Sequence, residues 1–66
     1  MTVELKEQEK AVLEKMAEGA TYEICGREMG FSGGYAKRIA YQLMQKIGAD
    51  NITQAVAIGF REGWLK

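Results

Sequence analysis

The chain has 66 residues, with nine basic and nine acidic side chains, so its formal net charge is zero. A chain of this length buries only about 60% of the surface that its unfolded form exposes, which limits it to one domain without a second lobe around a catalytic cleft. Histidine is absent and Cys25 is the one cysteine, so the sequence offers no imidazole base, internal disulfide or thiolate metal site, and we expect neither enzyme activity nor a cofactor.

The N-terminal stretch "MTVELKEQEK" lacks the apolar core of a secretion signal. No apolar run approaches the ~20 residues that a membrane span needs. An unpaired cysteine is typical of a reducing compartment. The sequence therefore predicts a cytoplasmic protein without a membrane partner.

Proline is absent and glycines separate the apolar segments, which predicts helices joined by short turns. A first helix is expected within residues 5–19, ending at Gly19. A short second helix is expected within residues 22–30, where Thr21 can cap its start and Gly30 ends it. The apolar residues of these two helices are spaced to share an inner face. They are Leu5, Val12, Leu13, Met16, Tyr22, Cys25 and Met29.

A third helix is predicted over residues 33–47, with Ser32 as its cap and Gly48 at its end. Its apolar stripe has to face the core, because a helix with one apolar stripe has nowhere else to bury it. That stripe consists of Ala36, Ala40, Leu43 and Ile47.

A fourth helix is predicted to follow Asn51, which with Gln54 resembles a capping box, and to end at Gly63. We found no strand alternation, repeat or linker, so residues 1–66 are expected to form a single all-α domain, a compact four-helix unit.

The fourth segment carries more apolar surface than one short helix needs, which suggests a homodimer contact. The alternative is that Trp64 folds back on the first helix to complete the core. The predicted contact residues are Ile52, Ala55, Ile58, Gly59, Phe60 and Trp64.

The charge is distributed unevenly: residues 1–30 hold seven acidic and four basic side chains, whereas residues 31–48 hold three basic ones and no carboxylate. With its apolar stripe inward, the third helix presents cations, amides and tyrosines outward. Such side chains bind phosphates and base edges, although a polar helix face can also be merely solvated. Two glycines after Ser32 are expected to leave the helix N-terminus open to a phosphate. The predicted DNA-binding residues are Thr21, Ser32, Gly34, Tyr35, Lys37, Arg38, Tyr41, Gln42, Gln45 and Lys46.

Two blocks of this sequence are similar to a known family, the LuxR/GerE-type helix-turn-helix domains of bacterial transcription regulators. "LKEQEKAVLEKMAEGATYEICGREMGFS" resembles the family's L-T-x-R-E-x-E-V-L-x-L-L-A-x-G-x-S/T-N-K-E-I-A-x-x-L-G-I-S. "KIGADNITQAV" resembles its K-L-G-V-x-N-R-T-Q-A-V. The resemblance runs without gaps from about Leu5 to Leu65.

The resemblance implies that the second and third helices bind DNA and that the fourth mediates dimerisation. Lys37 falls on a DNA-contacting lysine of the family. Arg38, Tyr41 and Gln42 fall on variable outward positions. The chain departs from the family where Thr, Val and His of the third helix are replaced by Tyr35, Ala36 and Ile39, where Cys25-Gly26 replaces Ile-Ala, and where Ile52 replaces Arg.

The sequence therefore predicts a sequence-specific transcription regulator that binds double-stranded DNA as a homodimer, with residues 33–47 in the major groove. Two such helices would read half-sites about one helical turn, ~34 Å, apart. The alternative is a protein-interaction module on the same scaffold that binds another regulator or RNA polymerase, which the zero net charge and the acidic first half favour. Met1 favours a stand-alone regulator over an excised C-terminal domain.

Overall fold

The structure is a computed structural model that describes residues 4–65, and it contains four helices. They are α1 (Glu7–Ala17), α2 (Tyr22–Glu28), α3 (Gly33–Ile47) and α4 (Ile52–Arg61). No strand occurs between residues 4 and 65. The prediction of an all-helical, compact fold is confirmed, with principal extents of 32 × 20 × 19 Å.

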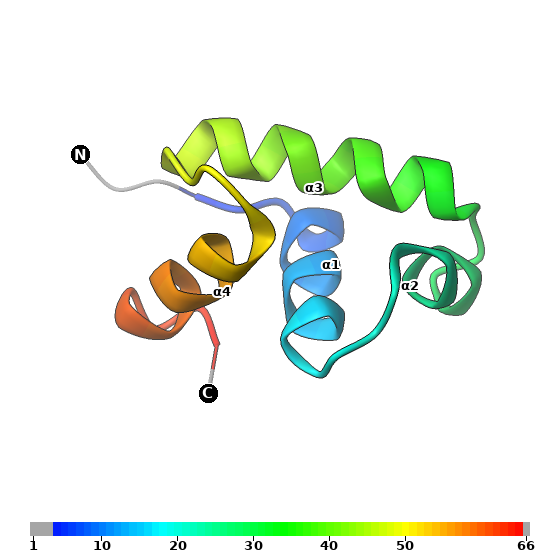
Figure 1. The fold of residues 1–66 in the computed structure, drawn as a ribbon, viewed down its shortest axis with the longest axis horizontal. Helices are drawn as coiled ribbons and strands as arrows, with labels where there is room; N and C mark the ends of the chain where they lie inside the picture. Colours follow the sequence, from blue (N-terminus) through cyan, green and yellow to red (C-terminus); the bar gives the residue numbers. More distant parts are fainter. Residues whose placement is uncertain (1–3, 66) are drawn as a thin grey trace.

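α3 is the longest helix and lies across the other three (Figure 1). It packs against α1, α2 and α4, while α1 also contacts both α2 and α4. α2 and α4 lie on either side of α1 in this view. This arrangement leaves the side of α3 that faces away from the other helices open to solvent.

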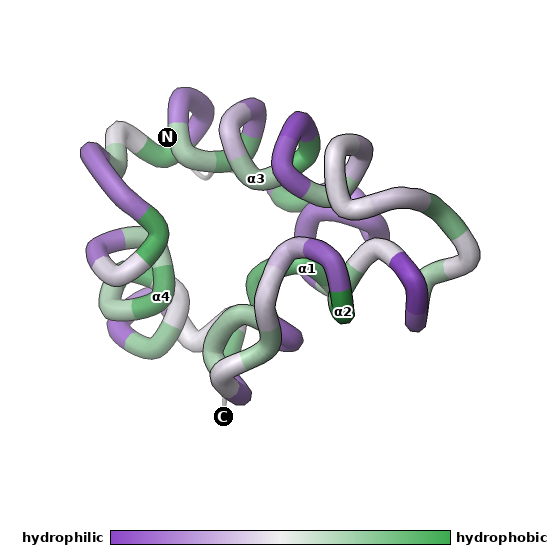
Figure 2. Tube along the Cα trace, turned by 45° about the vertical axis from the view of Figure 1, so that its right-hand side comes forward, coloured by the Kyte–Doolittle hydropathy of each residue, from purple (hydrophilic) through white to green (hydrophobic). Residues whose placement is uncertain are grey.

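The core draws on all four helices, and α3 contributes half of its buried side chains. The predicted stripe of α3 is buried at Ala36, Ala40 and Leu43, but Ile47 is only half-buried. Two further side chains of α3 are buried because helices pack on more than one of its sides. Figure 2 shows hydrophilic and hydrophobic residues alternating along this helix. The core residues are Val12, Leu13, Cys25, Ala36, Ile39, Ala40, Leu43, Met44, Ala55 and Leu65.

The predicted caps are confirmed at three helix starts. Thr21 Oγ1 and Ser32 Oγ accept hydrogen bonds from backbone N–H groups of α2 and α3, and Asn51 Oδ1 accepts one from α4. Gln54 reaches back to the N–H of Asp50, at 2.6 Å, rather than to that of its cap residue. Gly48 ends α3 in the left-handed region, with φ +74°.

The segment after α4 turns back onto the core. The N–H groups of Trp64 and Leu65 both donate to the carbonyl of Gly59, at 2.8 and 3.1 Å. Leu65 is buried, and Trp64 is half-buried against the core. The alternative in which Trp64 folds back to complete the core agrees with this packing, but the residue that becomes buried is Leu65, which that alternative did not name.

Two of the predicted dimer residues are wrong, because they lie inside the chain's own core. Ala55 is fully buried. Gly59 is also buried, and a Cβ on it would lie 2.9 Å from Leu65 Cδ1 and 3.0 Å from Leu13 Cδ2. Neither residue can contact a second chain while these helices stay packed.

Candidate nucleic-acid interface

Six residues form a polar strip along the outer surface of α3, which we call the α3 strip. All six are exposed, as the sequence predicted. At 3.6 residues per turn they lie on the side of the helix opposite its buried residues. The α3 strip consists of Gly34, Lys37, Arg38, Tyr41, Gln42 and Gln45.

The α3 strip carries two cations, and no carboxylate of the described residues neutralises them. Within residues 4–65, neither Lys37 nor Arg38 forms an ion pair. The ammonium of Lys37 lies 5.7 Å from the ring centroid of Tyr41, a weak cation–π contact that keeps the charge on the strip. The strip therefore carries a local positive field on a chain whose total charge is zero.

Close backbone contacts fix how α3 sits on α2. A Cβ on Gly26, inside α2, would overlap the carbonyl group of Ser32. A Cβ on Gly33 would lie 2.9 Å from the Cα of Glu23. The N–H of Phe31, in the connecting turn, donates to the carbonyl of Gly26 at 2.7 Å. The two helices therefore meet backbone to backbone, with little room to slide.

This packing corrects one expectation about the start of α3. The sequence predicted that both glycines after Ser32 leave the helix N-terminus open, but Gly33 is half-buried against α2. Gly34 is exposed, as predicted. A glycine in the interior of a short helix signals a close approach of another backbone, so Gly26 could have been singled out from the sequence.

Thr21 and Ser32 are exposed at the starts of α2 and α3. Their side-chain oxygens accept hydrogen bonds from Ile24 N–H, at 3.1 Å, and Tyr35 N–H, at 3.2 Å. Each hydroxyl hydrogen remains able to donate to a phosphate oxygen. Because Gly33 packs against Glu23, these two helix starts are neighbours.

Tyr35 lies at the edge of the α3 strip that faces α1. Its hydroxyl donates to Gln8 Oε1 at 3.2 Å, and its ring centroid lies 4.5 Å from that of Phe31. The side chain is partly engaged within the chain, so we place it beside the strip rather than on it. Sequence periodicity gave no sign of this contact with α1.

Lys46 was predicted to contact the DNA backbone, but its ammonium is bound within the chain. Lys46 Nζ lies 2.7 Å from Glu9 Oε1 and 3.3 Å from the carbonyl oxygen of Glu4. Glu9 is only 5% exposed, and its carboxylate also accepts the N–H of Lys6 at 2.8 Å. Releasing Lys46 to a phosphate would leave a buried carboxylate without its cation, which is costly. We therefore omit Lys46 from the interface.

This pair shifts the titration of Glu9. Burial raises the pKa of the Glu9 carboxyl, but the hydrogen bonds from Lys46 and from the Lys6 backbone outweigh burial, so the pKa lies below its ordinary value. A depressed folded-state pKa contributes stability above the unfolded value, about 4.3, and that stability is lost as the pH falls through the folded-state pKa.

We expect Glu9→Gln to destabilise the domain by about 1–3 kcal/mol at pH 7, because it leaves Lys46 without its anion. The cost should shrink below about pH 4.3, and urea unfolding at pH 7 and at pH 3 measures both values. Glu28→Gln is the matched control: it breaks the more exposed Lys15–Glu28 pair, at 2.9 Å, and should cost at most about 1 kcal/mol. Equal costs for the two variants at pH 7 would contradict the structural role of the Glu9–Lys46 pair.

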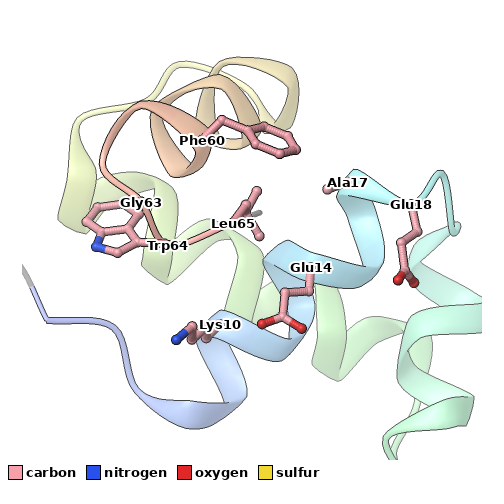
Figure 3. Close-up of a pocket in the computed structure, with 8 residues that line it drawn as sticks. All are labelled: Lys10, Glu14, Ala17, Glu18, Phe60, Gly63, Trp64 and Leu65. Carbon is pink, nitrogen blue, oxygen red and sulfur yellow. The ribbon is translucent and has the colours of Figure 1, made fainter.

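A second surface feature lies between α1 and the end of α4 (Figure 3). It is an open depression of about 540 Å³. Figure 3 shows Phe60 and Leu65 directed toward α1, with Ala17 opposite. Phe60 is 51% exposed, whereas the predicted dimer residues Ile52, Ile58 and Trp64 are half-buried. The depression is lined by Lys10, Glu14, Ala17, Glu18, Phe60, Gly63, Trp64 and Leu65.

Three further features of residues 4–65 concern metal ligands, the thiol of Cys25 and helix length. No group of three or more metal-ligating side chains occurs within residues 4–65. Burial raises the pKa of the Cys25 thiol, which keeps it protonated and unreactive at neutral pH. None of the four helices is long and apolar enough to cross a membrane.

The sequence matches no protein-family model, and no curated protein is significantly similar to it. The resemblance to LuxR/GerE-type domains therefore stays a prediction that rests on the two sequence blocks given above.

Proposed function

We propose that this protein is a sequence-specific transcription regulator that binds double-stranded DNA through α3, as LuxR/GerE-type domains do. The observation that carries the proposal is the α3 strip, in which Lys37 and Arg38 are exposed beside amide and tyrosine side chains and pair with no carboxylate of residues 4–65. A short α2, a tight turn and a longer α3 with a polar outer surface are the layout of a helix-turn-helix.

In the proposed complex α3 lies in the major groove, which is about 12 Å wide and admits a helix. The 15 residues of α3 span about 22 Å, enough to cross several base pairs. The α3 strip faces the base edges, and the hydroxyls of Thr21 and Ser32 donate to the phosphates beside it. The close backbone packing of α3 against α2 supports this pose, because a helix that is already held in place loses little conformational entropy on binding.

Binding to a random-sequence duplex at low salt tests the proposal. Association should be measurable and should weaken as salt is added, because released counterions drive it. If two phosphates are neutralised per subunit, the logarithm of the affinity should fall with the logarithm of salt concentration at a slope of roughly −1.8 per subunit. Absence of any association at low salt would end the proposal.

One observation favours a second candidate, a protein-interaction module. The exposed side chain of Phe31, which lies against the ring of Tyr35, lines a second open depression together with acidic residues of α1. Exposed apolar surface of this kind marks protein contacts. The partner in this case would be another regulator or RNA polymerase. The candidate gains support if the chain does not bind the duplex at low salt.

We also propose a homodimer through α4, for which Phe60 offers the largest exposed apolar side chain of that helix. The wild-type chain should sediment as a dimer at high concentration, and Phe60→Glu should shift it to a monomer, because a buried charge at the contact is costly. Phe31→Glu is the matched control, since Phe31 is 48% exposed but lies in the α2–α3 turn, and it should leave the dimer intact. A wild-type monomer at high concentration would remove the dimer from the proposal.

A further inference from the structure

Gly34 differs from the other glycines of the chain in having no internal reason to be glycine. All eight glycines lie within the described residues. Four have a positive φ, and three others would place a Cβ within 3.0 Å of a neighbouring atom. At Gly34 the φ is not positive, and a Cβ would meet nothing closer than Ser32 Oγ at 3.9 Å.

A glycine at this place weakens the helix without improving its packing. Alanine is a better helix former than glycine, because glycine loses more backbone freedom on folding. Where neither φ nor packing demands glycine, the missing side chain can serve the close approach of another molecule to the backbone. Gly34 lies in the first turn of α3, on the α3 strip and one turn before Arg38.

We propose that Gly34 is the point at which α3 comes closest to the duplex, so that the N-terminal half of α3 enters the major groove and Arg38 reaches a base edge beside it. This inference rests on the proposed function and adds the pose of α3 to it. Arg38 is exposed and forms no ion pair within residues 4–65, so its guanidinium is available to the O6 and N7 atoms of a guanine.

The group over Gly34 is a base edge or a thymine methyl rather than a phosphate. In the proposed pose the α3 strip, on which Gly34 lies, faces the base edges, whereas the Thr21 and Ser32 hydroxyls donate to the phosphates beside it. The missing side chain at Gly34 lets such an edge lie against the helix backbone.

The test is Gly34→Ala, measured for stability and for affinity toward the duplex that the wild-type chain enriches from a random pool. The variant should raise the midpoint of thermal unfolding by about 2–4 °C, because alanine favours the helix. It should lower the affinity by about 10-fold or more, the size of one lost base contact. Thr53→Ala is the matched control, because Thr53 is exposed on α4 outside the α3 strip, and it should change the affinity by less than about 3-fold. Gln45→Ala, at the other end of the α3 strip, should lose less affinity than Gly34→Ala.

The two measurements separate the possible failures. If Gly34→Ala is more stable and binds as tightly as the wild type, the pose is wrong while the proposed function stands. If Gln45→Ala loses more affinity than Gly34→Ala, the C-terminal half of α3 is the end in the groove, and the pose is again wrong. A destabilised Gly34→Ala chain would show an internal role for the glycine and overturn the inference. A wild-type chain that binds no duplex would overturn both this inference and the proposed function.

Discussion

Replacing Lys37 and Arg38 together with alanine is expected to lower the affinity for double-stranded DNA about 100-fold or more at low salt while the domain stays folded. Both side chains are exposed and form no ion pair within residues 4–65, so their removal costs no internal contact beyond the weak one with Tyr41. Each lost contact to a base or phosphate should cost about 1–3 kcal/mol. Fluorescence anisotropy with a labelled duplex measures the affinity, and circular dichroism checks the fold.

The matched control for this experiment removes the same amount of positive charge elsewhere. Lys10 and Arg61 are exposed on α1 and α4, away from the α3 strip. Their joint replacement with alanine should change the affinity by no more than about 3-fold and leave the salt slope nearly unchanged. If both double variants lose affinity equally, the affinity for DNA depends on the overall charge of the chain rather than on the side chains of α3.

The second large effect is expected for Gly26→Ala, which should destabilise the domain by about 3 kcal/mol or more. The added Cβ would overlap the Ser32 carbonyl, which is backbone and cannot rotate away. α2 would have to move from α3, disrupting the buried contacts of Cys25 beside it. A domain of this length has only about 3–10 kcal/mol of stability in total, so much of the chain should unfold on modest heating.

Thermal unfolding followed by circular dichroism measures this loss, and Gly34→Ala is the matched control. Both variants add one methyl group to a helical glycine, but only Gly26 faces another backbone. The two midpoints should move in opposite directions. An unchanged midpoint for Gly26→Ala would mean that α2 and α3 do not meet as closely as the structure has them.

The helices and the exposed side of α3 were predictable from the sequence because local chemistry decides them. Threonine, serine and asparagine caps bond to backbone groups three residues away, as they do at α2, α3 and α4. The repeat of small and apolar residues at Ala36, Ala40 and Leu43 defines the inner side of α3. Once that side is known, the exposure of Lys37 and Arg38 follows from helix geometry alone.

The predictions for Lys46, Ala55 and Gly59 are wrong for a different reason. The surroundings of these residues are formed by segments outside their own helix, which a local sequence pattern does not show. Lys46 looked free on its own helix, yet it pairs with Glu9, which lies 37 residues earlier. Gly59 was predicted at a dimer contact, but it faces Leu13 of α1 and Leu65 of the segment after α4. Ala55, predicted at the same contact, is fully buried.

By itself, then, the sequence determined that this protein is helical, where its helices begin and end, and that one helix carries basic side chains and no carboxylate of its own. Those features depend on hydrogen bonds and side-chain spacing within a few residues. Tertiary structure alone decided which cation is used internally, which glycines hold α2 against α3, and that Gly34 faces open space. These outcomes depend on which helices pack together, and that packing is set by the burial of side chains distant in sequence rather than by any local pattern.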